Sequence, residues 1–221
     1  MVLSIKGSLF NPSPRLLESV GAFLSYTMAT ISVFKSGKGS STRNTIPDEH
    51  LDFAEYITNI QEGYWYNEVT AYRGNKSEET KRRLTAVTPS GKFRKQGRDG
   101  LDQHSGILCM DIDAKDNDGV NIKALLNDEF LLAMHKSTGG EGYAAYYRIE
   151  PDHHLEAFYA LEKRLADKFH IIVDPACKDV SRLRFVSHDP EAFYTERKVA
   201  VFKAYLPKSK ATPGTKVLSP W

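Results

Sequence analysis

The chain has 221 residues, of which 41% are hydrophobic and 26% are charged, and its formal net charge is +2. This composition excludes fibrous and disordered proteins and is typical of a globular protein with one large or two small domains. A net charge so close to zero means that nucleic-acid binding must be argued from local charge patterning. The sequence shows neither a signal-peptide pattern nor a membrane-length apolar run, and its two cysteines lack CxxC spacing. We therefore expect a cytoplasmic protein with reduced thiols that does not contact membranes.

The first part of the chain alternates predicted helices with polar connectors. Apolar residues recur with helical spacing over residues 14–30 and 48–60, and residues 31–34 are typical of a short strand. A turn-rich segment at residues 36–44 contains a Gly-Lys pair. It is not a P-loop, because Gly39 stands where Ser or Thr should follow the lysine.

A basic stretch follows the second predicted helix. Cations bind phosphates and an aromatic ring can stack on a base, so a basic stretch that includes Phe93 indicates a single-stranded nucleic-acid surface. A solvated helix face followed by a hairpin is the alternative. The stretch also contains Lys81 and Arg98, and its candidate nucleic-acid contacts are Arg82, Arg83, Lys92, Arg94 and Lys95.

From residue 100 onward the pattern is more regular. An apolar strand ends in Asp111 and Asp113, and a short apolar segment follows at residues 131–135. We predict helices over residues 120–130 and 152–168, the second with Asp152 as its N-cap. Further strands are predicted at residues 143–149, 169–174, 180–187 and 198–205, and a loose tail or linker is predicted at residues 207–221.

Three carboxylates are the candidate metal ligands. Asp111 and Asp113 are two residues apart, so on a strand they project from the same face. Two acids side by side repel each other and need a nearby cation, and oxygen ligands suit Mg²⁺ or Mn²⁺. Asp174 ends a second apolar segment and would be the third acid. A strand that runs into a solvated acidic loop is the alternative.

Two further features suit phosphate binding. A glycine-rich turn exposes backbone N–H groups, so residues 137–142 are a candidate nucleotide cradle, with an ordinary tight hairpin turn as the alternative. Arg182 and Arg184 share one strand face and are candidate phosphate ligands, with surface ion pairing to Asp179 or Asp189 as the alternative. The candidate cradle residues are Ser137, Thr138, Gly139, Gly140 and Gly142.

Residues 104–113, 137–142 and 174–190, with His154 before a helix, resemble the VirE N-terminal type of domain in the archaeo-eukaryotic primase (primase-polymerase) superfamily. The resemblance implies an α/β (α+β) fold with a central, mostly antiparallel sheet and flanking helices. It also implies one primase-like domain over residues 1–206, with a helical part at residues 1–90 and a core at residues 91–206. In that family, the three acids would hold the catalytic metal ions.

The resemblance further implies a nucleotidyltransferase that replicates DNA of a mobile element or phage. Its cofactor would be Mg²⁺ or Mn²⁺, and its partners would be nucleoside triphosphates, a single-stranded DNA or RNA template, and a helicase in trans or in a longer parent chain. Where active primases carry a nucleotide-binding histidine, this chain has Ala144 or its neighbour Tyr143. Two alternatives therefore remain: a weak or inactive module that binds single-stranded nucleic acid, and a metal-dependent nuclease.

Overall fold

The computed structural model describes residues 29–36, 44–195 and 199–203, and they form a mixed α/β fold with antiparallel sheets. The central sheet has the strand order β10-β7-β8-β6, and each neighbouring pair is antiparallel. Its strands are β6 (Ile107–Ile112), β7 (Leu131–Lys136), β8 (Tyr143–Arg148) and β10 (Phe193–Tyr194).

A second antiparallel sheet has the order β2-β1-β3-β9, and a separate two-stranded hairpin pairs β4 with β5. The bounds of these strands are β1 (Thr30–Phe34), β2 (Glu49–Asp52), β3 (Ala86–Thr88), β4 (Gly91–Phe93), β5 (Leu101–His104) and β9 (Arg184–Phe185). The helices are α2 (Phe53–Glu62), α3 (Tyr66–Asn75), α4 (Glu78–Arg83) and α5 (His154–Phe169). Short 3-10 helices are η1 (Arg98–Gly100), η2 (Ala114–Asp116), η3 (Ile122–Asn127), η4 (Pro151–His153) and η5 (Pro175–Lys178).

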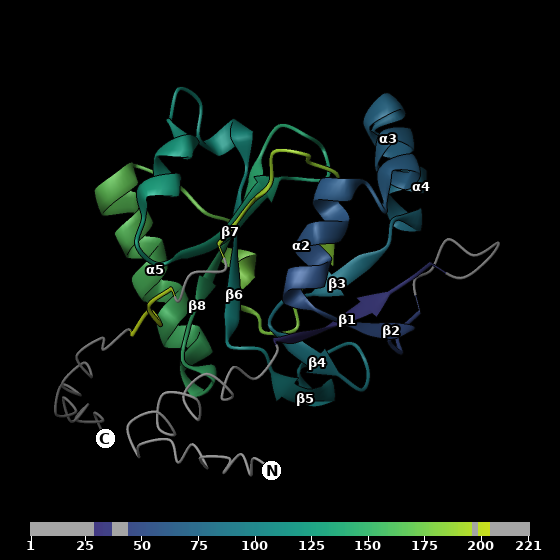
Figure 1. The fold of residues 1–221 in the computed structure, drawn as a ribbon, viewed down its shortest axis with the longest axis horizontal. Helices are drawn as coiled ribbons and strands as arrows, with labels where there is room; N and C mark the ends of the chain where they lie inside the picture. Colours follow the sequence, from purple (N-terminus) through teal and green to yellow (C-terminus); the bar gives the residue numbers. More distant parts are fainter. Residues whose placement is uncertain (1–28, 37–43, 196–198, 204–221) are drawn as a thin grey trace, which may run out of the picture.

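The central sheet is buried on both faces (Figure 1). On one face, Phe158 of α5 packs in the same apolar cluster as Met110 and Tyr147. On the other face, Tyr56 of α2 packs with Tyr146 and with residues of β1 and β3. Because successive side chains of β8 alternate between these two clusters, the strand is apolar almost throughout.

Several predicted elements are confirmed. The strands predicted at residues 31–34 and 143–149 are β1 and β8, and the apolar segment at residues 131–135 is β7. The helix predicted at residues 120–130 is present only as the 3-10 helix η3. The predicted helix at residues 14–30, apart from its last two positions, and the predicted tail at residues 207–221 lie outside the described residues.

Two predicted helix starts are wrong. Within the helix predicted over residues 48–60, Glu49–Asp52 instead pair with β1 as strand β2. Asp52 then caps α2 by accepting a hydrogen bond from the Ala54 N–H at 2.8 Å. Asp152 lies within η4 and makes no side-chain cap, and α5 begins at His154. In both cases the helix begins later than predicted, because the residues before its first turn adopt another backbone conformation.

Residues 169–174 do not form the predicted strand. Helix α5 ends at Phe169, and His170 adopts the left-handed conformation with φ of 58°. The extended segment that follows bonds to a side chain and to one strand carbonyl: the Ile172 N–H donates to Asn117 Oδ1, and the Asp174 N–H donates to Asp111 O at 2.9 Å. The segment therefore lies beside the end of β6 without forming a ladder.

The last two predicted strands are also much shorter than expected. Within residues 180–187 only β9 is a strand, and among the described residues 199–203 only Phe202 forms an isolated parallel bridge, to Ile149. In the part of the chain that the structure describes, no helix has the length and apolar character of a membrane span.

Candidate functional site

A cavity of about 470 Å³ lies where the ends of β6 and β7 meet β9. It brings together the three predicted acids, both predicted arginines and the first part of the glycine-rich turn, although Asp111 and Arg184 are more than seventy positions apart in sequence. We call it the acid cavity. Its lining residues are Tyr72, Lys81, Asp111, Asp113, Ser137, Thr138, Gly139, Asp174, Arg182, Leu183, Arg184 and Phe185.

Strand β6 and its continuation place the first two acids in this cavity. Met110 and Ile112 are buried in the cluster under α5, so strand alternation directs Asp111 to the opposite face. Asp113 follows directly after the strand and lines the same cavity. Asp174 joins them because its N–H donates to the Asp111 carbonyl, which holds the segment after α5 against β6.

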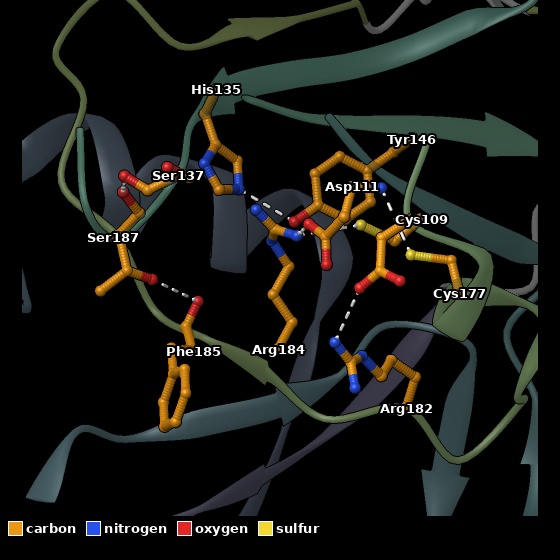
Figure 2. A network of polar contacts seen from close by, with 12 residues as sticks. Cys109, Asp111, His135, Ser137, Tyr146, Cys177, Arg182, Arg184, Phe185 and Ser187 are labelled. Atoms are coloured by element: carbon orange, nitrogen blue, oxygen red, sulfur yellow. Dashed lines mark hydrogen bonds and ion pairs between the residues drawn. The ribbon is translucent and has the colours of Figure 1, made fainter. Parts of the chain in front are cut away.

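Two of the three acids form ion pairs with the predicted arginines (Figure 2). The Arg184 guanidinium pairs with Asp111 and is buried, with 7% of the residue exposed. Arg182 donates to Asp174 Oδ2 at 3.0 Å, and about half of its side chain remains exposed. The predicted alternative, pairing with Asp179 or Asp189, is not observed for either arginine: Asp179 pairs with Arg98.

Asp113 differs from the other two acids. It is exposed, and its carboxylate makes no hydrogen bond or ion pair with any residue that the structure describes; its backbone oxygen accepts from Asn117 Nδ2 at 2.9 Å. Asp113 is therefore the carboxylate most accessible to a ligand in the cavity.

Beside Arg184 lies a network of uncharged side chains formed by His135, Tyr146 and Cys109 (Figure 2). His135 Nδ1 donates to the Lys136 carbonyl at 2.7 Å, so its Nε2 is the acceptor for the Tyr146 hydroxyl at 2.9 Å. Burial lowers the pKa of His135 to about 4 and raises the pKa of the Cys109 thiol, whose sulfur accepts from Arg184 Nη1 at 3.7 Å. Because these groups are uncharged at neutral pH, Asp111 is the group that compensates the Arg184 charge.

The position at which the family resemblance implies a histidine also lies in this region. Ala144 of β8 pairs with Asp111 on one side and with His135 on the other, and it is fully buried. Directly paired residues share a face of the sheet, so position 144 is next to Asp111. Sequence reasoning missed His135, which lies one strand further from the acid.

The glycine-rich turn connects β7 to β8 as a tight hairpin, as the alternative interpretation proposed. The Ser137 N–H donates to Gly142 O at 2.7 Å, and the Gly140 N–H donates to Ser137 O at 2.9 Å. Gly140 has φ of +86°, and a Cβ at Gly142 would lie 2.5 Å from the Ile112 carbonyl. These two glycines serve the turn rather than lining the cavity. Within the described chain, the backbone N–H groups of Thr138 and Gly139 have no hydrogen-bond acceptor, so the turn can also bind an anion.

Arg73 of α3 also holds this turn, and sequence reasoning missed it. Its Nε donates to Thr138 O at 2.9 Å, and its Nη2 donates to Ser137 O at 3.2 Å. The same Nη2 also donates to Ser187 Oγ and to the His188 carbonyl. No motif marks residue 73, because its role depends on α3 lying beside a turn more than sixty positions later in the chain.

Replacing Arg73 with alanine is expected to lower the free energy of unfolding by about 2 kcal/mol, because several half-buried carbonyl groups lose a charged donor. Urea unfolding followed by circular dichroism measures the loss. Glu141→Gln is the matched control, since it breaks the exposed ion pair of Lys76 with the same turn and is expected to cost less than about 0.5 kcal/mol. Equal losses in the two variants would show that Arg73 does not hold the turn.

The predicted nucleic-acid contacts lie outside the acid cavity. Arg82 and Arg83 are in the last turn of α4, and Arg83 pairs with Glu79. Lys92 on β4 pairs with Asp102, and Lys95 pairs with Asp99. Of the basic stretch, Lys81 alone lines the cavity.

The interpretation of Phe93 as a base-stacking ring is wrong. The side chain is 1% exposed. Its backbone N–H donates to Ser32 Oγ at 2.7 Å, which fixes β4 against β1. Phe93 is thus a core residue.

The carboxylate oxygens of the cavity are the donor type that Mg²⁺ and Mn²⁺ prefer. In the described ranges, no group of three or more His, Cys, Asp or Glu side chains is arranged to hold a metal ion. Two of the three acids, Asp111 and Asp174, each pair with an arginine instead. The donor set fits a divalent ion in its chemistry, and Asp113 is the acid whose carboxylate has no partner among the described residues.

Comparison with protein-family models matches residues 79–194 to the family described as BT4734-like, N-terminal domain, which is just over half of the chain. The chain belongs to this family. The matched part of the BT4734-like domain contains the three acids, the turn and both arginines, whereas Arg73 and Tyr72 precede it. Neither curated proteins nor solved structures give a match. The relation to the primase-polymerase superfamily stays a prediction.

Proposed function

We propose that this BT4734-like domain is a metal-dependent nucleotidyltransferase of the primase-polymerase type, acting in the replication of mobile-element or phage DNA. The observation that carries the proposal is the acid cavity, which gathers carboxylates, a turn with free N–H groups and two arginines from distant segments. Nucleotidyl transfer uses these groups together: metal ligands, phosphate donors and cations around one reacting phosphate. A central antiparallel sheet with flanking helices is compatible with the same superfamily.

Asp111, Asp113 and Asp174 are the residues that would hold Mg²⁺ or Mn²⁺. A bound divalent ion would polarise the phosphate and make the attacking hydroxyl more acidic. Asp113 accepts the ion without breaking any existing contact. Asp174 becomes available when the exposed Arg182 turns to the phosphates, while the buried Arg184 keeps Asp111 oriented.

The remaining lining residues would bind a nucleoside triphosphate. The N–H groups of Thr138 and Gly139 can donate to phosphate oxygens, as in other glycine-rich turns. Lys81 adds a cation at the same cavity, and Tyr72 adds an aromatic face for the base. In this proposal the template contacts remain those predicted on the basic stretch, where Arg82 and Arg94 have no side-chain partner among the described residues.

A specific observation supports the alternative of a binding module without catalysis. Position 144 beside Asp111 is alanine, so the domain lacks the histidine that active primases would place there. In addition, the arginines neutralise two of the three acids. A binding module with these residues would still hold phosphate groups but would not activate a hydroxyl.

A primer-extension assay tests the proposal. The native chain is incubated with a primed single-stranded template, labelled deoxyribonucleotides or ribonucleotides, and either Mg²⁺ or Mn²⁺. We expect extension with at least one of the metals and none after chelation. Retention of the oligonucleotide without incorporation under both metals would refute the enzyme and favour the binding module, and shortening of the oligonucleotide would favour the nuclease.

A further inference from the structure

We infer that a single strand of nucleic acid leaves the acid cavity through a basic groove formed by Arg98, Lys178 and Arg182. The inference rests on the proposed function for the identity of the strand, whose 3′ end would lie at the acids. It places this strand on a surface different from the predicted contacts of α4 and β4.

Three cavities that share lining residues define this groove. A cavity of about 400 Å³ shares Arg182 and Leu183 with the acid cavity. A third cavity, of about 470 Å³, shares Arg98 and Lys178 with the second. The groove therefore runs from the three acids, past η5, to the start of α5. We call the second cavity its middle part and the third its far end.

The middle part of the groove is positively charged. Its lining includes the cations Arg98, Lys178 and Arg182 and one acid, Asp179, which pairs with Arg98 at 3.1 Å. Lys178 is exposed and makes no hydrogen bond or ion pair with any described residue. Arg182 pairs with Asp174 of the acid cavity, so Lys178 is the cation of the middle part that has no partner among the described residues. A cluster of three cations in a cavity of this size suits the phosphates of a nucleic-acid backbone.

The loop that carries Lys178 and Arg182 has a backbone fixed by hydrogen bonds. Asp174 Oδ1 accepts from the Ala176 N–H at 2.8 Å, and so caps η5. Asp179 Oδ1 accepts from both the N–H and the hydroxyl of Ser181, and the Arg182 N–H donates to Asp179 O at 2.9 Å. A loop that is already ordered loses little conformational entropy when it binds a ligand.

The far end of the groove is suited to bases rather than phosphates. Its lining includes Leu155 and Tyr159, which are 48% and 43% exposed, and the acids Asp152 and Glu156, which offset Arg98 and Lys178. An exposed ring can stack on any base, but bases offer their faces only in a single strand. The combination of a basic middle part and an aromatic far end therefore favours single-stranded nucleic acid over a duplex.

Binding of a fluorescently labelled single-stranded oligonucleotide, measured by anisotropy over a series of salt concentrations, tests the inference. The native chain is used with chelator and without nucleotides, so that no catalysis is needed. Lys178→Ala is expected to weaken binding roughly threefold to tenfold and to reduce the slope of log affinity against log salt by about 0.7, the value for one phosphate contact on a single strand. Gln96→Lys, which adds a cation to the middle part, should increase the slope by about the same amount.

Lys123→Ala is the matched control, because Lys123 is an exposed lysine that lines a cavity elsewhere in the molecule. Tyr159→Ala should weaken binding about fivefold or more with an unchanged salt slope, since stacking does not release counterions. The groove would be refuted if Lys178→Ala and Lys123→Ala changed the affinity and the salt slope equally, or if Gln96→Lys did not increase the slope. Tighter binding of duplex than of single strand would also refute it. DNA and RNA oligonucleotides in parallel show which backbone it prefers.

The outcome is separable from that of the proposed function. A domain that fails in primer extension but shows the expected changes in slope refutes the enzyme and retains the groove. A domain that extends primers but shows no change in slope with Lys178→Ala or Gln96→Lys retains the enzyme and refutes the groove.

Discussion

Replacing Asp111 with alanine is expected to lower the free energy of unfolding by about 3–5 kcal/mol, the cost of leaving one partner of a buried ion pair alone. The Arg184 side chain is only 6% exposed, and its other side-chain hydrogen bond within the described residues is to the neutral Cys109 sulfur. Without Asp111 its charge stays buried with no counterion. Urea unfolding at neutral pH, followed by circular dichroism, measures this loss.

Two comparisons make the result specific. Asp174→Asn removes the charge of the other acid that pairs with an arginine but keeps a side-chain oxygen to accept from the Ala176 N–H. Because Arg182 is 47% exposed, we expect a loss below about 1 kcal/mol. The double variant Asp111→Ala/Arg184→Met removes both charges and should be more stable than Asp111→Ala alone. Similar losses for the two single variants would mean that Arg184 is solvated in the folded protein.

Replacing Asp113 with asparagine is expected to lower metal-dependent nucleotide incorporation by about 10²–10³-fold without changing the melting temperature. Asparagine keeps the size of the side chain but removes the charge that a divalent ion requires. Because the Asp113 carboxylate is exposed and has no partner in the described structure, folding does not depend on it. Steady-state primer extension with Mg²⁺ and Mn²⁺, together with a thermal melt, checks both parts.

Asp116→Asn is the matched control. Asp116 is another exposed acid of the same loop, it lies three residues further along, and it does not line the acid cavity. Its removal should leave incorporation unchanged. Full activity in Asp113→Asn, or an equal loss in Asp116→Asn, would exclude Asp113 as a metal ligand.

Local sequence patterns predicted those elements in which the burial of each side chain follows directly from the secondary structure. Strand β8 is apolar because the sheet is covered on both faces, and the spacing of Asp111 and Asp113 follows from the alternation of a strand. The prediction failed at residues 49–52, which have helical spacing but pair with β1. That pairing is non-local: Thr30 is opposite Asp52, and a hydrogen bond joins Ser32 Oγ to His50 Nδ1 at 3.0 Å. Propensity over a short window does not contain this contact.

By itself, the sequence predicted the candidate side chains for the site: the paired acids, the third acid, the turn and the two arginines. Only the tertiary structure decided that the acids, the arginines and the first part of the turn line one cavity, and that Arg73 holds the turn. It also decided that Arg184 is buried against Asp111, while the Asp113 carboxylate has no partner among the described residues. The physical reason is that residue type and spacing act locally, whereas the strength of an ion pair depends on burial. Burial is set by segments that meet only when the chain has folded.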